Sequence, residues 1–484
     1  MAWSALKGLY RKRLQGRLRL EVDTRDLLIL VVLTLVTIVI MFWRLGEGTL
    51  TDFDEADYAQ SAREMLWTGD WNTPRWNGME FFDKPPLSLW FTALAYKVFG
   101  VNEFSARCVS ALAGVLAILM TYVLGRELFG SRAVGLGAAA MLLTCSPNLF
   151  SHGYNFVGLA RVGMLDMPLI LALMVAVWLA WRCQRNPRYL VWLGAALGVG
   201  LMIKSVAGFL AWGIVALYML TSVPRASWWR REAIVGGVVA VLVAAPWHLG
   251  QLLLWGGHFW NSYMVSLTVG YVTGEQGHTR DWLFYFRSIQ RGFPILYPLL
   301  ALAVAYAVYR ALRHRDSAAR LLLCWTLVPM VLYNVSRSRI GWYMIPTYPA
   351  LALLASSLLV RVVRSRLALV VILVATLAFN PWLPRAGNFN PDVKAVASYS
   401  GYVLDEGAIV VNYWPGSYWI RPAALFYADR PVLLVTEEQA LRQVLSTPGD
   451  FYILADWAHW EGLQELGEVV YRSGDYVLVQ AYPS

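Results

Sequence analysis

Charged residues are scarce in this chain of 484 residues. Asp, Glu, Lys and Arg make up 15% of it, whereas 58% of the residues are hydrophobic, which is too apolar for a water-soluble protein of this length. Apolar runs of about 17–25 residues recur along most of the chain, and each is long enough to cross a membrane as a helix. The short alternating segments of a transmembrane β-barrel are not the pattern seen. The sequence therefore predicts an α-helical polytopic membrane protein.

Cysteine is also rare, and nucleotide-binding motifs are missing. The four cysteines show neither metal-ligand spacing nor a disulfide pattern: Cys108, Cys145, Cys183 and Cys324. No glycine-rich phosphate loop and no nucleotide fingerprint occurs, which argues against a nucleotide-sugar donor. The net charge of +10 reflects arginines in short clusters between apolar runs, where membrane topology explains them better than nucleic-acid binding does.

The apolar runs predict about eleven transmembrane helices. They cover residues 27–43, 104–128, 133–150, 167–182, 188–204, 205–222, 232–254, 293–312, 319–335, 342–360 and 366–380. With a cytoplasmic N-terminus, the arginine-rich turns fall on the cytoplasmic side, for example at Arg182 and Arg185, as the positive-inside rule requires. No small-residue cleavage site follows the first run, so residues 1–26 are predicted to be a retained basic segment, cytoplasmic or interfacial.

Three regions follow from this topology. The transmembrane region is residues 27–380, with two long extracytoplasmic loops at 44–103 and 255–292. The apolar piece from Pro85 to Gly100 is placed on the outer interface, because a span there would put every later arginine turn outside. Residues 381–484 contain four short β-like runs separated by helical stretches, which predicts a small extracytoplasmic α/β domain. The runs are "AIVVNYW", "PVLLVT", "FYILAD" and "YVLVQAY".

The first long loop begins with a dense group of acids in "TDFDEADYAQSAREML". Asp52, Asp54, Glu55 and Asp57 stand within six residues, at the expected start of a helix. Carboxylates are favoured there by the helix dipole, so a capped, solvated helix end is one interpretation. A functional site is the other.

Further charged and aromatic groups lie at the same predicted face of the membrane: Lys84, Arg161, Asp166, Lys204, Arg337, Arg339 and Tyr343. Charges at membrane depth are costly and usually face a partner or a cavity. Snorkelling to the interface is the alternative for Lys204, and anchoring is the alternative for the arginines. The second long loop carries His258, His278 and Arg280 among many aromatics, which fits either an interfacial belt or a lid over a site for a sugar and a lipid head group.

An acid and several cations on one side of a membrane indicate a particular chemistry. A single carboxylate that deprotonates a hydroxyl, surrounded by cations that hold a phosphate leaving group, is what glycosyl transfer from a lipid phosphate requires. A transporter or lipid flippase is the hypothesis from another class. It predicts charges near the bilayer midplane and broken helices in paired halves, whereas no two-fold hydropathy repeat is visible here.

Six motifs, in order over roughly residues 27–360, carry a family resemblance. They are "DFDEADYAQSAREM", "FFDKPPLSLWFTALAYKVFG", "EFSARCVSALAGVLAILMTYVLGRELFG", "ARVGMLDMPL", "GLMIKS" and "SRSRIGWYMIPTYPALALL". Together they resemble the superfamily of polyprenyl-phosphate-sugar-dependent glycosyltransferases of GT-C fold, which includes the protein O-mannosyltransferases and the lipid A aminoarabinose transferases. The resemblance implies a GT-C membrane domain and an inverting transfer on the outer face.

The resemblance also suggests roles for residues. Asp54 matches the general base, Glu55 the second acid of the pair, and Asp166 an acid that shapes the same pocket. With these, the residues predicted to bind the donor phosphate are Lys84, Arg161, Lys204, Arg280, Arg339 and Tyr343, and those predicted to line the acceptor and sugar pocket are Tyr58, His258 and His278. Family members often have Lys at the position of Arg339, and the zinc ligands of some relatives have no match here. No cofactor is therefore predicted with certainty, and a divalent metal stays an open alternative.

The predicted partners are a polyprenyl-phosphate-linked sugar, a lipid or glycan acceptor and membrane lipids, with no nucleic acid. Transfer to Ser or Thr of a protein, as in the mannosyltransferases, is the alternative activity. The predicted location is the plasma (inner) membrane, with the active site and the C-terminal domain extracytoplasmic.

Overall fold

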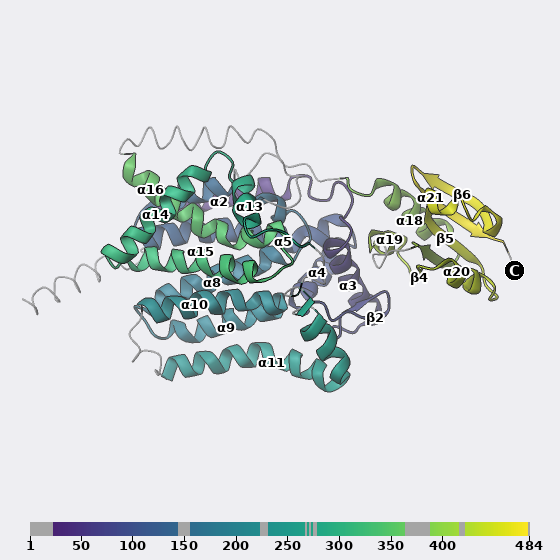
Figure 1. Cartoon of the computed structure of the whole chain (residues 1–484), viewed down its shortest axis with the longest axis horizontal. Coiled ribbons are helices and arrows are strands. Elements are labelled where there is room, and N and C mark those ends of the chain that lie inside the picture. The colour runs from purple at the N-terminus through teal and green to yellow at the C-terminus, as the bar shows by residue number, and fades with distance from the viewer. Residues whose placement is uncertain are drawn as a thin grey trace, which may run out of the picture. The chain divides into compact units, whose positions relative to one another are not determined.

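A computed structural model of the chain describes residues 23–143, 155–222, 231–266, 269–270, 273, 278–363, 388–415 and 422–482 (Figure 1). The predicted last span at 366–380, Cys145 and almost all of the basic segment 1–26 lie outside these residues. The chain forms two compact units. We call them the helical unit, Met1–Trp43 with Ser110–Arg161 and Leu165–Pro384, and the mixed unit, Arg44–Val109 with Val162–Met164 and Arg385–Ser484.

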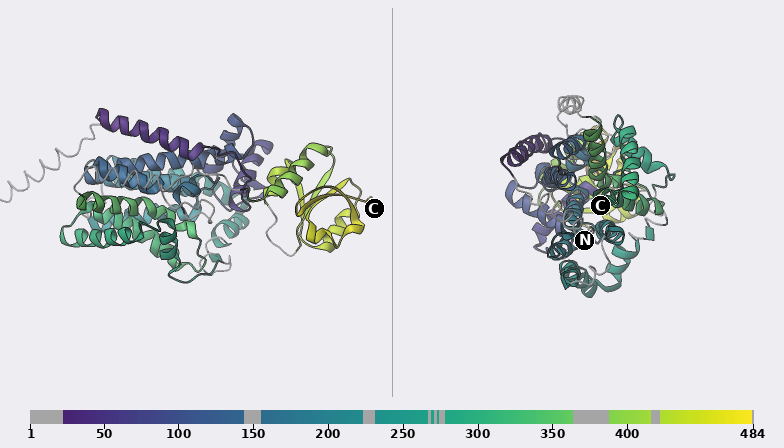
Figure 2. Two further views of the ribbon diagram at one scale, coloured as in Figure 1. Left: turned by 90° about the horizontal axis from the view of Figure 1, so that it is seen from above. Right: turned by 90° about the vertical axis from the view of Figure 1, so that its left-hand side faces the viewer.

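The helical unit is built from helical segments, of which the long apolar ones run along a common direction (Figures 1 and 2). The segments are α2 (Thr24–Phe42), α5 (Glu103–Phe129, whose first turns belong to the mixed unit), α6 (Arg132–Leu143), α7 (Phe156–Ala160), α8 (Asp166–Cys183), α9 (Tyr189–Ile203), η1 (Ser205–Gly208), α10 (Phe209–Ser222), α11 (Arg231–Phe259), η3 (Trp260–Ser266), α13 (Phe284–Gly292), α14 (Tyr297–Arg313), α15 (Ser317–Val335), η4 (Gly341–Thr347) and α16 (Tyr348–Val362).

The predicted polytopic helical architecture is confirmed. Among the described residues, seven helices are long and apolar enough to cross a membrane, and an eighth span results if α13 and α14, which are bent by 115°, count as one. Helices α6 and α9 are apolar but shorter, with 12 and 15 residues. The total of eleven spans therefore stays a prediction.

Glycines allow α9 and α11 to pack at backbone distance. A Cβ atom on Gly194 would lie 1.9 Å from the carbonyl oxygen of Gly236, and one on Gly236 would lie 2.3 Å from that of Leu190. Small residues let helices approach closely in membranes, where the hydrophobic effect does not drive their association. Glycine at positions 194 and 236 is thus required for α9 and α11 to pack this closely.

Replacing Gly236 with alanine is expected to destabilise the helical unit by about 1–3 kcal/mol, because the added methyl group overlaps the backbone of α9. The adjacent Gly237 is a matched control, since a Cβ atom there meets nothing within 4 Å. Thermal unfolding in detergent should show a lower melting temperature for Gly236→Ala alone. Equal melting temperatures for the two variants would mean that α9 and α11 do not pack in this way.

The long helix α11 turns back on itself after its membrane-length part. Gly256 has φ 51° and ψ −127°, and the π-helical segment η3 follows it. Tyr263 of η3 bonds to His248 at 2.8 Å between Oη and Nε2, and its ring lies 5.8 Å from that of Trp247. The start of the predicted loop 255–292 is therefore a folded continuation of α11.

The mixed unit combines the first loop with the C-terminal domain, which we define as residues 388–482. Its elements are α3 (Asp54–Thr68), β1 (Arg75–Trp76), β2 (Met79–Glu80), α4 (Leu87–Phe99), α18 (Pro391–Val403), β3 (Ile409–Tyr413), α19 (Pro422–Ala428), β4 (Val432–Val435), α20 (Glu438–Leu445), β5 (Phe451–Asp456), α21 (Trp457–Trp460), η5 (Gln464–Leu466), β6 (Gly467–Ser473) and β7 (Tyr476–Ala481). Helix α4 has 13 residues, shorter than the roughly 20 that a span needs.

The C-terminal domain is the predicted small α/β domain. Its sheet has the strand order β4-β3-β5-β7-β6, with β3 parallel to both β4 and β5, and β7 antiparallel to β5 and β6. The predicted strands in "AIVVNYW", "PVLLVT", "FYILAD" and "YVLVQAY" are confirmed, whereas β6 was not predicted. The exact borders of the three predicted regions stay predictions.

One hydrophobic core joins the first loop to the C-terminal domain. Ala59 of α3 and Tyr96 of α4 share this core with Leu425 of α19 and Leu478 of β7, and all four are buried. A second core, on the side of α20, is built around residues such as Trp460. The first loop and the tail are thus one folded body, although about 280 residues separate them.

Candidate active site

The acid helix α3 begins at Asp54, and the residue before it has an unusual backbone conformation. Phe53 has φ 69° and ψ −135°, a backbone conformation that is unfavourable for any residue other than glycine. Such strain of about 1–3 kcal/mol persists only where the surroundings impose it, and it occurs often at active sites. Asp54 is half-buried at the helix N-terminus, where the dipole favours its ionised form.

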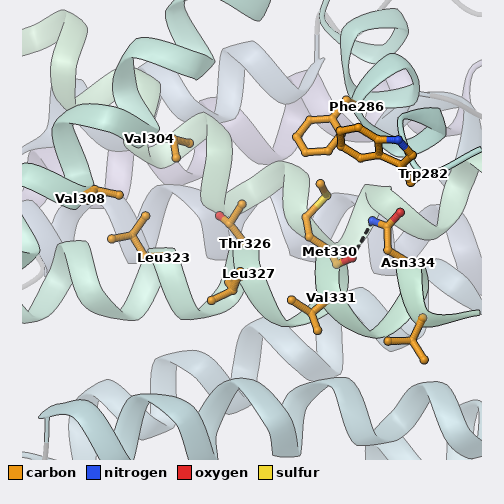
Figure 3. Close-up of a pocket in the computed structure, with 11 residues that line it drawn as sticks. Trp282, Phe286, Val304, Val308, Leu323, Thr326, Leu327, Met330, Val331 and Asn334 are labelled. Carbon is orange, nitrogen blue, oxygen red and sulfur yellow. Dashed lines mark hydrogen bonds between the residues drawn. The ribbon is translucent and has the colours of Figure 1, made fainter.

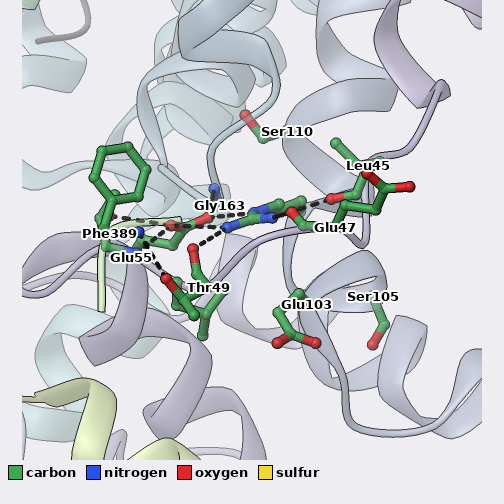
Figure 4. Close-up of polar contacts among 12 residues, drawn as sticks. Leu45, Glu47, Thr49, Glu55, Glu103, Ser105, Ser110, Gly163 and Phe389 are labelled. Atoms are coloured by element: carbon green, nitrogen blue, oxygen red, sulfur yellow. Dashed lines mark hydrogen bonds and ion pairs between the residues drawn. The ribbon is translucent and has the colours of Figure 1, made fainter. Parts of the chain in front are cut away.

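Glu55 points to a different set of partners and is fully buried. It accepts hydrogen bonds from Arg107 Nε at 2.8 Å, from the Thr51 N–H at 2.7 Å and from the Gly163 N–H at 2.9 Å (Figure 4). Arg107 in turn donates to the carbonyl of Thr49 at 2.8 Å. Because its oxygens are bound in this way, Glu55 is suited to holding the loop. Its predicted catalytic role stays a prediction.

Asp57 is a neighbour of Asp54 that the sequence did not single out as a site residue. Burial raises the pKa of the Asp57 carboxyl well above its usual value, and the charges of Asp54, Asp83 and Asp52 raise it further, whereas Lys84 opposes the shift. Asp54 and Lys84 therefore act on the same carboxyl group. Lys84 is buried and donates to Asp83 at 2.6 Å, and Tyr58 is buried one residue after Asp57. The mixed unit thus holds three of the predicted site residues, and the charges of two of them, Asp54 and Lys84, affect the same buried carboxyl group.

The helical unit holds a second polar cluster. Lys204, at the end of α9, donates to both oxygens of Asp166 at 2.7 and 2.8 Å, and both side chains are buried. The ammonium lies 5.5 Å from the centre of the Tyr343 ring, which stacks on Tyr333 at 4.8 Å. Three residues from distant predicted motifs are therefore neighbours. Lys204 is not snorkelling, because it has a buried carboxylate as partner.

A short β-bridge brings the predicted arginines together. Thr279 pairs with Ser338, and the Arg339 N–H donates to the carbonyl of His278 at 3.0 Å. The Arg339 guanidinium also donates to the carbonyl of Arg280. His278, Arg280 and Arg339 thus form one cluster in the helical unit.

Two predicted residues have other surroundings. Arg161 donates to the carbonyls of Ile40, Met41 and Trp43 at 2.8–3.0 Å, and so satisfies the C-terminal end of α2. His258 lies at the exposed end of α11. Binding of donor phosphate by Arg161 and of the acceptor by His258 stay predictions.

An apolar groove of about 770 Å³ lies along α14 and α15 (Figure 3). Its lining includes Met330, Val331 and Phe286, and at one end Trp282 and Asn334. The groove leads to the arginine cluster, because Arg339 Nη2 donates to the carbonyl of Asn334 at 2.8 Å. No sequence pattern indicated this groove.

No group of three or more His, Cys, Asp and Glu side chains is arranged to hold a metal ion within the ranges that the structure describes.

Comparison with known proteins agrees with the fold and the motifs. A family model for dolichyl-phosphate-mannose-protein mannosyltransferases matches residues 83–249. An undecaprenyl phosphate-α-4-amino-4-deoxy-L-arabinose arabinosyl transferase of Pseudomonas paraeruginosa is 34% identical over 325 residues, which cover 64% of this chain and 56% of that protein. One from Pseudomonas aeruginosa is 33% identical over 333 residues, with the same shares. The chain thus spans little more than half the length of these relatives.

Two solved structures resemble most of the chain in fold. The crystal structure of ArnT from Cupriavidus metallidurans bound to undecaprenyl phosphate has a TM-score of 0.76 at 20% identity, covering 94% of this chain and 98% of that one. The archaeal oligosaccharyltransferase AglB from Archaeoglobus fulgidus has a TM-score of 0.58 at 15% identity, covering 90% and 70%. The predicted GT-C fold is therefore confirmed. The chain is a multi-pass membrane protein that is similar in sequence to undecaprenyl phosphate-α-4-amino-4-deoxy-L-arabinose arabinosyl transferases over about two thirds of its length.

Proposed function

We propose that this protein transfers a sugar, with inversion, from a polyprenyl phosphate carrier to a lipid or glycan acceptor at the extracytoplasmic face of the inner membrane. The apolar groove along α14 and α15 carries the proposal, because its lining residue Asn334 accepts a hydrogen bond from the Arg339 guanidinium. A long hydrocarbon chain with a phosphate at its end needs an apolar channel and cations at one end of it. The sequence relatives named above act on undecaprenyl phosphate carrying an amino sugar, as their names state.

In the proposed reaction, Asp54 accepts the proton of the acceptor hydroxyl while the oxygen of that hydroxyl forms a bond to the anomeric carbon. The bond from that carbon to the phosphate oxygen breaks, and the carrier phosphate leaves with the electron pair. Lys84, Arg280 and Arg339 stabilise the negative charge on this leaving group. Attack on the side opposite the leaving phosphate inverts the anomeric centre.

The arginine-rich helix ends support the proposed orientation, with the N-terminus in the cytoplasm. Arg182 and Arg185 lie at the C-terminal end of α8, and Arg310 and Arg313 at that of α14. The positive-inside rule places such ends in the cytoplasm.

Purified protein in liposomes with undecaprenyl phosphate-linked 4-amino-4-deoxy-L-arabinose tests the activity. Addition of a lipid acceptor such as lipid A should release free undecaprenyl phosphate and yield a glycolipid in equal amounts. Movement of the intact donor across the bilayer without release of carrier phosphate would instead show a transporter, and would overturn the proposal.

Transfer to protein is the second candidate, and the match to the mannosyltransferase family model over residues 83–249 favours it. A parallel reaction with a Ser- and Thr-rich peptide and a mannosyl phosphate donor distinguishes the two. A glycopeptide product without a glycolipid product would replace the lipid acceptor by a protein.

Filling the groove should weaken binding of a long-chain donor. Val331→Trp places a large ring in the lining, so KM for the undecaprenyl donor is expected to rise about tenfold, equivalent to ~1.4 kcal/mol, with a smaller effect on a donor of two isoprene units. Leu332→Trp is the matched control, because Leu332 is the next residue on α15, is exposed, and is not part of the lining. Equal KM values for both variants would exclude the groove as the lipid site.

A further inference from the structure

We propose that the C-terminal domain positions the acid helix: α19 and the residues before α18 hold residues 49–52, from which the chain enters α3 at Asp54. The inference rests on the proposed role of Asp54 as the base. It assigns to the C-terminal domain a part in catalysis that does not require contact with either substrate.

The first contacts are made by the segment before α18. The Thr49 hydroxyl accepts hydrogen bonds from the Phe389 N–H at 2.8 Å and the Asn390 N–H at 2.9 Å (Figure 4). The Asn390 side chain donates to the carbonyl of Leu50 at 3.3 Å. Thr49, Leu50 and Asn390 are all buried, so water does not compete for these bonds.

Helix α19 makes the next contacts. The Tyr427 hydroxyl accepts a hydrogen bond from the Leu50 N–H at 2.8 Å and donates one to Glu103 Oε1 at 3.1 Å. Glu103 also pairs with Lys394 of α18. The backbone of Leu50 is therefore fixed at its N–H by α19 and at its carbonyl by Asn390.

Helix α19 is itself bound at both ends, at one end to Asp52 and at the other end to α3. The Ala423 N–H, in the first turn of α19, donates to Asp52 Oδ1 at 3.2 Å. At the other end, Arg63 of α3 donates to the carbonyls of Leu425 and Phe426 at 3.0 and 2.6 Å, and to Asp429 at 2.7 Å. The Arg63 side chain is 3% exposed. These contacts keep α19 alongside α3.

The strained backbone at Phe53 explains why these bonds would matter for catalysis. A φ of 69° there is not a local preference, so the hydrogen bonds on residues 49–52 are needed to impose it. If they weaken, Phe53 relaxes, and the Asp54 carboxylate turns with it. A displacement of about 1 Å at a catalytic group costs on the order of 10²-fold in rate.

Two tyrosine variants separate positioning from stability. Tyr427→Phe removes the hydroxyl that binds Leu50. Tyr476→Phe is the matched control, because Tyr476 lies in the same core, is also buried, and donates to Asn412 at 3.0 Å, away from residues 49–52. Each variant loses the buried hydrogen bonding of one hydroxyl, so both melting temperatures should fall, that of Tyr427→Phe by at least as much because its hydroxyl makes two of the bonds described. Only Tyr427→Phe should lower kcat, by about 10- to 100-fold, with KM for the donor unchanged.

The double variant Tyr427→Phe with Asp54→Asn shows whether Tyr427 acts through Asp54. Once the base is gone, its position no longer matters, so residual transfer should equal that of Asp54→Asn alone. A further loss in the double variant, or equal kcat values for Tyr427→Phe and Tyr476→Phe, would overturn the inference and leave the proposed function intact. Normal turnover by Asp54→Asn alone would instead remove the base, and the inference with it.

Discussion

Replacing Asp54 with asparagine is expected to lower the rate of sugar transfer by about 10²- to 10⁴-fold, the usual contribution of a general base. The amide cannot accept the acceptor proton, yet it has nearly the shape of the carboxylate and can still occupy the first position of α3. The protein should therefore keep its melting temperature and its affinity for undecaprenyl phosphate. Release of free carrier phosphate from the sugar-linked donor measures the rate.

Glu80→Gln is the control for the loss of a negative charge from the same loop. Glu80 is half-buried and pairs with Arg75 at 3.0 Å, and such partly exposed pairs contribute about 0–1 kcal/mol. Its transfer rate should stay within about twofold of the unsubstituted protein, since this corresponds to roughly 0.4 kcal/mol at the transition state. If Asp54→Asn turned over as fast as Glu80→Gln, another group would have to be the base, and Asp57 is the nearest carboxyl group that follows it on α3 without being held by Arg107 as Glu55 is.

The helices could be predicted because a long apolar run has few structural alternatives in a membrane. Every backbone N–H and C=O must be satisfied within the segment, so the run becomes a helix. The predicted span 319–335 corresponds to Ser317–Val335, and the predicted span 167–182 to Asp166–Cys183. The bend between α13 and α14 was not predicted, since composition does not indicate the direction of the chain.

Strand β6 was not predicted, because its outward side chains make its apolar character weak. Val469 and Val470 are partly exposed, and the strand pairs along one edge only. A signal was present in the turn that follows: Gly474 has φ 52° and connects β6 to β7. A glycine between Ser473 and Asp475, flanked by β-branched and aromatic residues, is a hairpin pattern.

The residues of the candidate site could be predicted from the sequence, whereas the partner of each side chain could not. The sequence placed Asp166, Lys204 and Tyr343 at one face, and the structure shows that they are neighbours. It did not reveal that Glu55 is bound by Arg107, which is 52 residues away. A lone arginine in the apolar run "EFSARCVSALAGVLA" was the available signal, because a charge in such a run usually has a partner.

Substituting one member of the pair between Glu55 and Arg107 is expected to produce the largest loss of stability in the mixed unit. The two side chains are 0% and 3% exposed, and Arg107 also donates to the carbonyls of Leu45, Glu47 and Thr49. Arg107→Met leaves the Glu55 carboxylate buried without its cation, which typically costs about 3–5 kcal/mol. A fall of that size is measurable as the unfolding free energy or melting temperature of the protein in detergent.

A double variant of the same pair tests whether the two buried charges stabilise each other. In the double variant Glu55→Gln with Arg107→Met, no charge is left unpaired, so its loss of stability should be smaller than the sum of the two single losses. The exposed pair Arg442 and Glu438 on α20 is the reference, since Arg442→Met should cost at most about 1 kcal/mol. Additive losses at Glu55 and Arg107 would mean that they do not interact. The role of Glu55 in holding residues 49–52, and with them the approach to Asp54, would then have to be abandoned.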